Sequence, residues 1–298
     1  MNILKKVLIC VLFLGVGLWI GQYVYVPDLM ADANEQIVTD DRNAEVKIPD
    51  YPTAVIPSDL RISPIIEAFG RESTARDKDK TIMITLPKDV EYINERTYKH
   101  YPMVVIDMSS PSSVLKAYTK LGNIFHRDDI ANSIVNGSGD ALSNAVSKVP
   151  SSQDGQKKVL YLKAPYEIPK KDTIEDNILL QSRVISIWDT GIELSGGDEY
   201  NSYVSITKEQ IAEFAPDVII CKTNVGKRTV ERDLKELEAV KNENVFSIED
   251  TDYHFEFDEY HSIPAMIWLI KKTYNLDTPD PDGFYKWYLS ATKSNYKF

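Results

Sequence analysis

The fold class is decided by the stretch Lys208-Glu209-Gln210-Ile211-Ala212-Glu213-Phe214-Ala215-Pro216-Asp217-Val218-Ile219-Ile220. Its first half predicts a short helix over Lys208–Ala215, which Thr207 and Gln210 open with a capping box. Pro216 cannot continue that helix, and the apolar run after it predicts a buried strand over Asp217–Lys222. Strands that are apolar on both faces belong to parallel sheets covered by helices, so the stretch indicates an α/β protein.

The same strand and helix patterns recur on both sides of this stretch. Short runs rich in Val and Ile predict further strands over Ala54–Pro57, Thr81–Leu86, Met103–Asp107, Val159–Leu162 and Asn244–Ile248. Helical patterns lie between them, over Pro64–Phe69, Val90–His100, Ser112–Phe125, Thr173–Ile187 and Thr229–Val240. This alternation of strands and helices predicts parallel sheets.

These elements fall into two blocks, an N-terminal lobe over residues 51–125 and a C-terminal lobe over 151–262. Residues 126–150 between them predict one long connecting helix, although Gly137 and Gly139 lower its helix propensity. Residues 263–298 predict two closing helices, over Ile263–Tyr274 and Phe284–Ser290. The predicted architecture is therefore two Rossmann-like α/β lobes with mainly parallel sheets, joined by a long helix.

The first 33 residues carry targeting information. Lys5 and Lys6 precede an uncharged stretch from Val7 to Val26, which as a helix of about 30 Å could span a bilayer. Basic residues before it stay cytoplasmic, so we expect an uncleaved membrane anchor with the rest of the chain outside. The alternative is a cleaved signal peptide, since Ala31-Asp32-Ala33 fits a cleavage site. The polar residues 34–50 predict a flexible tether.

The composition excludes several functional classes. The chain has 298 residues, 43% of them hydrophobic, and a formal net charge of −11, without the basic stripe that a nucleic-acid binder needs. Its two cysteines, Cys10 and Cys221, provide neither a disulfide framework nor a cysteine metal site. The sequence lacks the Gly-x-Ser-x-Gly elbow, the phosphate-binding loop and the His-Glu-x-x-His motif. We therefore expect no catalytic residues and no cofactor.

Several motifs, taken in their order and spacing, resemble one known family. They are Glu193-Leu194-Ser195-Gly196-Gly197, Tyr203-Val204-Ser205, Glu209-Gln210-Ile211, Ala215-Pro216-Asp217-Val218-Ile219-Ile220, Ala239-Val240-Lys241-Asn242-Glu243-Asn244-Val245, Leu121-Gly122, Ile267-Trp268-Leu269 and Phe284-Tyr285-Lys286-Trp287-Tyr288. They resemble the cobalamin and ferric-siderophore binding proteins of ABC importers, the class III periplasmic-binding-protein family. The resemblance covers residues 110–298 well and residues 51–109 poorly.

This resemblance implies two lobes bridged by one long helix, with the ligand in the cleft between them. It also implies ABC permease subunits as partners, because the family docks through one surface Glu on each lobe onto permease Arg residues. Those positions fall on Glu95 and Glu209. The implied function is delivery of a metal chelate, such as a ferric siderophore, haem or corrinoid, to a membrane importer.

Candidate ligand-binding residues follow the predicted strands, because ligands of open α/β sheets bind beyond the carboxyl ends of strands. The first lobe offers Ser58, Asp59, Arg61, Ser109 and Ser110, and the second offers Tyr166, Lys222, Thr223, Asn224 and Tyr253. Trp188 is a further candidate, since aromatic side chains suit a large planar or apolar chelate.

Two alternatives remain open at this point. His254, Asp258, Glu259 and His261 have the chemistry of metal ligands, so a bare metal ion is one alternative to a chelate. A membrane-tethered sensor or adaptor domain of the same fold is another, since fold does not determine function. The sequence does not separate ferric chelate, haem, corrinoid and oxyanion as ligands.

Overall fold

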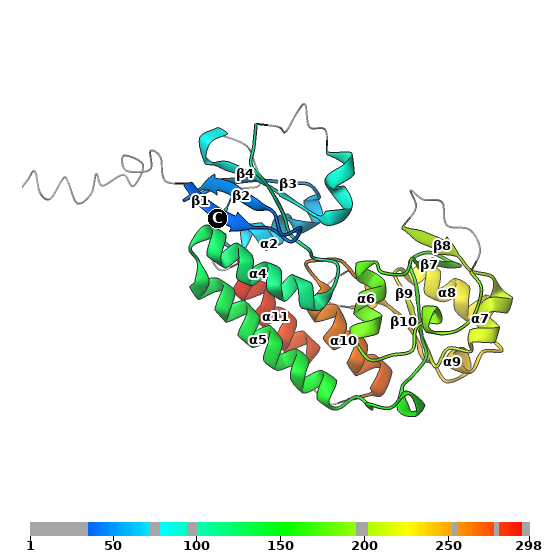
Figure 1. Cartoon of the computed structure of the whole chain (residues 1–298). Helices are drawn as coiled ribbons and strands as arrows, with labels where there is room; N and C mark the ends of the chain where they lie inside the picture. The colour runs from blue at the N-terminus through cyan, green and yellow to red at the C-terminus, as the bar shows by residue number, and fades with distance from the viewer. Residues whose placement is uncertain are drawn as a thin grey trace, which may run out of the picture.

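Two parallel three-stranded sheets form the framework of the molecule, one in each lobe (Figure 1). The computed structural model describes residues 35–71, 78–93, 100–194, 202–251, 256–276 and 280–293. The first sheet has the order β3-β4-β5, with bounds Ala54–Pro57, Thr81–Thr85 and Met103–Val105. The second has the order β10-β9-β6, with bounds Val245–Ser247, Val218–Cys221 and Val159–Leu162. Each predicted strand is present, and the prediction of an α/β class with parallel sheets is confirmed.

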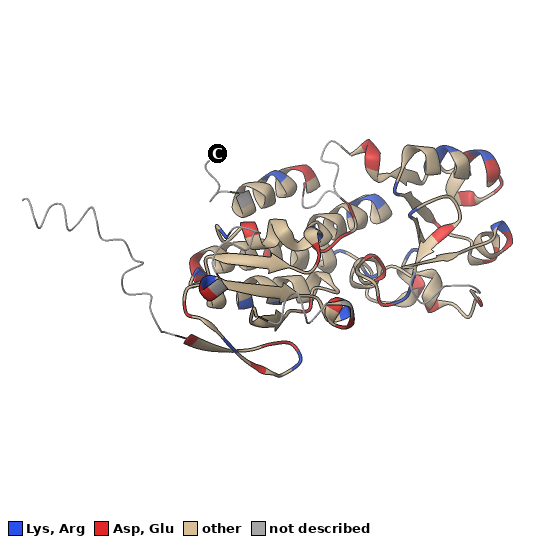
Figure 2. Cartoon of the chain, turned by 90° about the horizontal axis from the view of Figure 1, so that it is seen from above, with Lys and Arg blue, Asp and Glu red and all other residues tan. Residues whose placement is uncertain are grey.

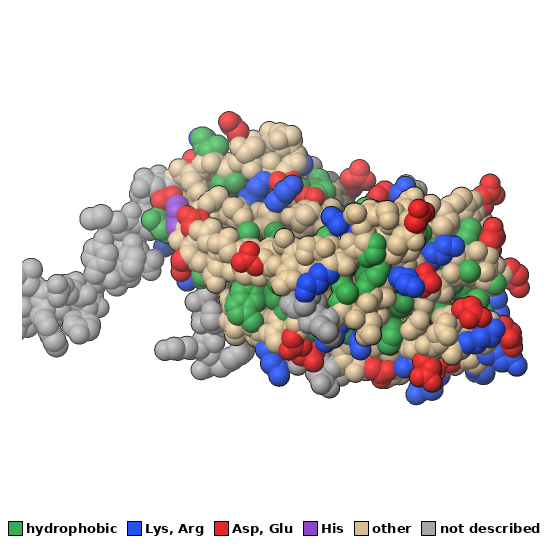
Figure 3. All heavy atoms as spheres, turned by 90° about the horizontal axis from the view of Figure 1, so that it is seen from below, with side chains coloured by type: hydrophobic (Ala, Val, Ile, Leu, Met, Phe, Trp, Pro, Cys, Tyr) green, Lys and Arg blue, Asp and Glu red, His purple; other side chains and the backbone are tan. Residues whose placement is uncertain are grey.

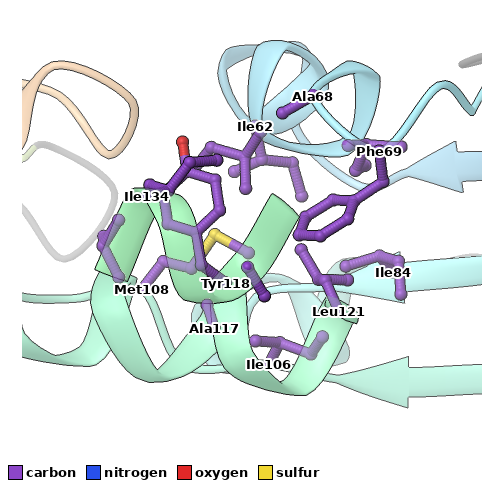
Figure 4. Close-up of a cluster of buried hydrophobic side chains, with 14 of the residues drawn as sticks. Ile62, Ala68, Phe69, Ile84, Ile106, Met108, Ala117, Tyr118, Leu121 and Ile134 are labelled. Atoms are coloured by element: carbon purple, nitrogen blue, oxygen red, sulfur yellow. The ribbon is translucent and has the colours of Figure 1, made fainter. Parts of the chain in front are cut away.

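The core of the first lobe is built on the inner face of helix α4, Pro111–Phe125 (Figure 4). Tyr118 and Leu121 of this face lie toward Ile84 of β4 on one side and toward Phe69 on the other. Phe69 follows the short helix α2, Ser63–Glu67. Because all four side chains are at most 2% exposed, their burial is a main source of this lobe's stability.

Helix α5, Asp128–Ser147, runs from one lobe to the other (Figure 1). Its Ile130 and Ile134 belong to the core of the first lobe, while its Ala145 belongs to the core of the second. A helix of 20 residues is about 30 Å long, which is enough to connect two domain cores. Helices α10, Ser262–Tyr274, and α11, Pro281–Lys293, pack against α5 and complete the base of the molecule.

The two glycines of α5 have different surroundings. A Cβ atom on Gly137 would lie 2.3 Å from the ring of Trp287 in α11, whereas a Cβ on Gly139 would meet nothing within 4 Å. Gly137 therefore allows α11 to approach α5 closely, and its cost in helix propensity is offset by this packing. The connecting helix forms because tertiary contacts override the local preference of glycine.

The second lobe has a different helix pattern from the predicted one. Its helices are α6 (Ile174–Gln181), α7 (Lys208–Phe214), α8 (Asn224–Asp233) and α9 (Glu238–Lys241). The helix predicted over Thr173–Ile187 ends at Gln181, because Ile185 hydrogen-bonds to the backbone of Lys157 at the sheet edge. The single helix predicted over Thr229–Val240 is wrong: α8 begins at the Thr223 cap and α9 is separate.

A small antiparallel pair, β7 (Glu167–Pro169) and β8 (Tyr203–Ser205), was not predicted in the second lobe. In the first lobe, the helix predicted over Val90–His100 is replaced at its start by a 3₁₀ helix, Pro87–Tyr92. Residues 94–99 of that prediction lie outside the described residues.

The flexible tether predicted over residues 34–50 is wrong. Strands β1 (Glu35–Thr39) and β2 (Glu45–Pro49) form an antiparallel hairpin there. Ile48 is 1% exposed in the first core, and the Gln36 amide donates to the carbonyl of Ile124 in α4 at 2.9 Å. At the turn, buried Asp40 accepts hydrogen bonds from the backbone of Arg42 and Ala44. The hairpin therefore belongs to the first lobe despite its polar composition.

Charged residues of both signs are interspersed over the surface. Figure 2 shows Lys and Arg beside Asp and Glu along the helices of the second lobe. Figure 3 shows the same mixture on another face, with apolar side chains scattered between the charges. Several exposed charges form ion pairs, such as Lys241 with Glu238 at 3.3 Å. Such pairs contribute little stability, because water screens them.

The surroundings of the two glycines predict opposite effects of alanine. Gly137→Ala should lower the free energy of unfolding by about 1–3 kcal/mol, because the added methyl overlaps the rigid ring of Trp287. Gly139→Ala is the matched control and should raise it by up to about 1 kcal/mol through helix propensity. Urea unfolding of both variants measures the difference. Equal stabilisation by both alanines would show that α11 does not need the space at Gly137.

Candidate ligand site at the strand ends

In the first lobe, Asp59 holds Arg61 just beyond the end of β3. The Asp59 carboxylate caps the 3₁₀ turn Leu60–Ile62 by accepting from the Arg61 backbone at 2.9 Å. It also accepts from the Arg61 Nε at 2.9 Å, and this hydrogen bond raises the pKa of Arg61. Burial would raise the pKa of Asp59, but the bonds from Arg61 lower it below its ordinary value. The guanidinium is thus a fixed positive charge in a fixed direction.

Glu259 brings a buried carboxylate to the same place. It lies in the crossover segment Glu256–Ser262, which leads from the second lobe into α10. The Glu259 side chain is 2% exposed, and its Oε1 accepts from Lys88 Nζ at 2.9 Å. Its Oε2 lies 3.8 Å from Arg61 Nη1. Lys88 follows β4, so cations from two neighbouring strand ends converge on one carboxylate.

In the second lobe, Lys163 follows β6 and lies over an aromatic ring. Its ammonium is 3.5 Å from the centroid of the Tyr203 ring, which is a cation–π contact. The Tyr203 hydroxyl donates to Glu175 Oε1 of α6 at 2.6 Å. Burial lowers the pKa of Lys163, whereas burial and the charge of Glu175 raise the pKa of Tyr203. Lys163 has no carboxylate at ion-pair distance within the described residues.

Lys222 and Asn224 follow β9, the central strand of the second sheet. Lys222 Nζ pairs with Glu256 Oε2 of the crossover segment at 2.9 Å, and both side chains are partly exposed. The backbone of Asn224 donates to Glu249 Oε2 at 2.7 Å. The side chain of Lys222 is therefore held by a carboxylate that water also reaches.

Charges of the two lobes act on each other across this region. Arg61 of the first lobe lowers the pKa of both Lys163 and Tyr203, and Glu175 of the second lobe raises the pKa of Arg61. Such coupling requires that these groups lie near one another. We call this group the strand-end cluster; it comprises Arg61, Lys88, Lys163, Glu175, Tyr203, Lys222, Glu256 and Glu259.

The serines after β5 join the two lobes directly. Ser110 caps α4 by accepting from the backbone of Ser113 at 3.1 Å, so its hydroxyl is already occupied. The neighbouring carbonyl of Ser109 accepts from Asn177 of α6 at 2.9 Å. Gln181 of α6 bonds to Ser112 of α4 through both its amide oxygen and its amide nitrogen. These contacts fix α6 against the start of α4.

Tyr166 and Trp188 bond to residues that do not belong to the strand-end cluster. The Tyr166 hydroxyl donates to Asp233 Oδ2 at 2.9 Å, and Lys208 of α7 pairs with the same oxygen at 3.0 Å. The Trp188 ring nitrogen donates to the carbonyl of Pro169 at 3.0 Å, and the ring packs on the core of the second lobe. Both aromatic side chains therefore have structural partners of their own.

Glu209 is exposed near the start of α7, and no ion pair holds it in the described part of the chain. The helix follows the predicted capping box between Thr207 and Gln210. Because α7 leads into the start of β9 and packs on it, its first turn lies near the carboxyl end of that strand. Glu95, Tyr253 and the Gly196-Gly197 turn lie outside the described residues.

The residues that the sequence nominated as metal ligands have different partners in the structure. Asp258 accepts at 2.7 Å from the His261 backbone and contacts its Nδ1 at 2.9 Å, while Glu259 faces Lys88 and Arg61. His254 lies outside the described residues. Within the ranges that the structure describes, no three His, Cys, Asp or Glu side chains gather as metal ligands. Cys221 is buried, which raises the pKa of its thiol to about 12.

The fold matches solved structures of solute-binding proteins. An ABC transporter solute-binding protein from Sulfurospirillum deleyianum aligns with a TM-score of 0.65 at 16% identity, over 87% of this chain and 95% of its own. Molybdate-bound MolA from Haemophilus influenzae aligns with a TM-score of 0.63 at 12% identity, over 88% of this chain and 99% of its own. Nickel-bound CeuE from Helicobacter pylori aligns with a TM-score of 0.63 at 12% identity, over 87% of this chain and 96% of its own. The chain has the fold of ABC-transporter solute-binding proteins. No family model and no curated protein matches its sequence.

Several residues of the strand-end cluster were not nominated from the sequence as ligand-binding candidates, among them Lys88, Lys163, Glu175 and Tyr203. Lys88 and Lys163 follow predicted strands, so the rule that nominated Arg61 and Lys222 could also have found them. Tyr203 could not be placed before β8 was known, and Glu175 is a helix residue with no signal of its own.

A hollow of about 450 Å³ lies elsewhere on the solute-binding fold, between β1 and the second half of α4. Its lining comprises Gln36, Ile37, Val38, Thr39, Lys116, Thr119, Lys120, Asn123 and Ile124. None of these belongs to the strand-end cluster. In the part of the chain that the structure describes, no helix has the length and apolar composition needed to cross a bilayer. The segment Val7–Val26 lies outside that part.

Proposed function

We propose that this chain is an extracytoplasmic solute-binding protein of an ABC importer, which binds a metal chelate between its lobes and delivers it to the permease. The observation that carries the proposal is the strand-end cluster. In this fold the cluster gathers charged and aromatic groups from both lobes beyond the carboxyl ends of their strands. The ligand would be a ferric siderophore, haem or corrinoid.

The chemistry of the cluster favours a chelate that carries negative charge. Arg61, Lys163 and Lys222 offer cationic donors, and the Tyr203 ring offers an aromatic face. A bare cation would instead need several deprotonated ligands without cations beside them. Glu259 does not meet that need, because Lys88 and Arg61 already compensate it. MolA, with its bound molybdate, has the same fold and an anionic ligand.

A bare metal ion is the second candidate. The contact of His261 with Asp258 at 2.9 Å favours it, since a carboxylate that bonds one ring nitrogen orients the other nitrogen for a metal. CeuE with bound Ni(II) has the same fold. This site would also need His254.

For localisation we propose an uncleaved anchor at Val7–Val26, with the two lobes outside the cytoplasm. An N-terminal sequence starting at Met1 in the membrane fraction is the expected result. A sequence starting at Asn34 would show signal cleavage instead.

The ligand class predicts selective effects of lysine substitutions. Lys163→Met and Lys222→Met should each weaken binding of an anionic ferric tricatecholate about tenfold or more, because each removes a charged donor. Lys227→Met is the matched control, since Lys227 pairs at 3.5 Å with Asp250 and is not in the cluster. Isothermal titration with ferric tricatecholate, ferric trihydroxamate, haem and cyanocobalamin measures the affinities.

Two results would contradict the chelate. Equal losses in all three lysine variants would show that the effect is not specific to the cluster. Tight stoichiometric binding of zinc, manganese or ferric ion, lost when His254 and His261 become Ala, would assign the protein to bare metal ions.

For docking, we propose that Glu95 and Glu209 each pair with a permease Arg. The double variant Glu95→Lys, Glu209→Lys should abolish ligand uptake by cells while the affinity for ligand stays within about twofold, because Glu209 is exposed outside the strand-end cluster. Glu45→Lys, at an exposed position of β2 in the first lobe, is the charge-matched control and should support normal uptake. Normal uptake by the double variant would remove the docking proposal.

A further inference from the structure

Glu259 and Glu175 are the buried carboxylates of the strand-end cluster, and Glu259 is the one that faces the cations Lys88 and Arg61. Its side chain is 2% exposed, whereas that of Glu256 is 54% exposed. Glu259 Oε1 accepts from Lys88 at 2.9 Å, but Oε2 has no hydrogen-bond partner among the described residues and lies 3.8 Å from Arg61. A buried carboxylate oxygen without a hydrogen bond is costly, so the position is maintained by the surrounding charges.

The two kinds of carboxylate leave different cations available. Glu256 can leave Lys222 for water when a ligand arrives, since an exposed ion pair is weak. The side chains of Lys88 and Arg61 are 51% and 47% exposed, but their departure would leave the buried Glu259 carboxylate without a counter-ion, so both cations stay with it. Arg61 is further neutralised by Asp59. Glu175, the other buried carboxylate, accepts from the Tyr203 hydroxyl at 2.6 Å and forms no ion pair in the described residues. Two cations then remain for a ligand: Lys163, which has no ion pair in the described residues, and Lys222.

We propose that Glu259 is a specificity-determining residue that sets the charge of the ligand. It acts as a permanent internal counter-ion for Arg61 and Lys88, so that the site accepts about two negative charges, on Lys163 and Lys222. This inference rests on the proposed function, because it concerns the ligand of the same site.

Glu259→Gln tests the proposal because it removes the charge and keeps the shape. The amide oxygen of Gln can still accept from Lys88. The affinity for a trianionic ferric tricatecholate should rise about tenfold, because one negative charge near the ligand is lost in a region of low effective dielectric. The affinity for dianionic molybdate should rise less, and that for a neutral ferric trihydroxamate should not change. Isothermal titration of wild type and variant with these three probes measures the dependence on charge.

Two further variants sharpen the test. Lys88→Gln removes a positive charge instead, so it should lower the affinity for the tricatecholate by a similar factor; it also serves if Glu259→Gln does not fold. Asp250→Asn is the control, since it removes a carboxylate whose partner, Lys227, lies outside the cluster, and it should change none of the affinities.

The outcomes separate the two levels of inference. A rise with Glu259→Gln and a fall with Lys88→Gln, both growing with ligand charge, would support the proposal. Lower affinity in both variants for all probes would show that Glu259 only positions Arg61, and would overturn it. If wild type binds the probes and neither variant differs, only this inference fails. If wild type binds none of them, the proposed ligand class fails, and the inference with it.

Discussion

The arrangement of both lobes depends on the crossover segment Glu256–Ser262, which packs into two cores at once. Its Phe257 stacks on Tyr161 of the second lobe, with ring centroids 4.6 Å apart. Three residues later, the buried Tyr260 packs in the first core, where its carbonyl accepts from the hydroxyl of Tyr288 at 3.0 Å. Aromatic pairs of this kind add to the stability gained from burial alone. A change in the angle between the lobes would have to break one of these contacts.

The same segment explains why the candidate site is assembled without the ligand. Glu256 and Glu259 lie three residues apart in it, and they pair with Lys222 of the second lobe and Lys88 of the first. Helix α5 also packs in both cores and fixes the distance between them. The bonds of Gln181 in α6 to Ser112 in α4 add a further connection between the lobes. A site held from several sides loses less conformational entropy when a ligand binds.

The sequence predicted the fold where a pattern is local and strong. Buried parallel strands are apolar on both faces, so each of the six was found within two residues at either end. The hairpin Glu35–Pro49 was missed because its strands are short and polar, with Ile48 as their one buried residue, and because part of its stability comes from α4, which is distant in sequence. The break between α8 and α9 was missed because an apolar stripe continues across it.

The candidate site was predicted less completely, for a physical reason. Strand-end rules identify positions such as Arg61 and Lys222, but they do not say which charges meet. Glu259 illustrates this, because its neighbours in sequence, Asp258 and His261, indicate a metal site. Its neighbours in space are Lys88 and Arg61, two cations that follow strands more than 170 residues earlier in the chain. The identity of a counter-ion depends on tertiary structure, and no local pattern encodes it.

The balance of charge at the strand ends also bears on how a carrier releases its ligand. If Lys222 were left without a partner when the ligand departs, the cost of an unpaired charge in a partly buried site would oppose release. Glu256 lies on the same crossover segment and pairs with Lys222 at 2.9 Å in the ligand-free protein, so an internal carboxylate replaces the ligand as it leaves. The weakness of this exposed pair then has a function: it competes with the ligand only modestly, yet it lowers the cost of the empty state. For a protein that must both bind its ligand and surrender it to a permease, such a compensated site suits the task better than a ring of unpaired cations.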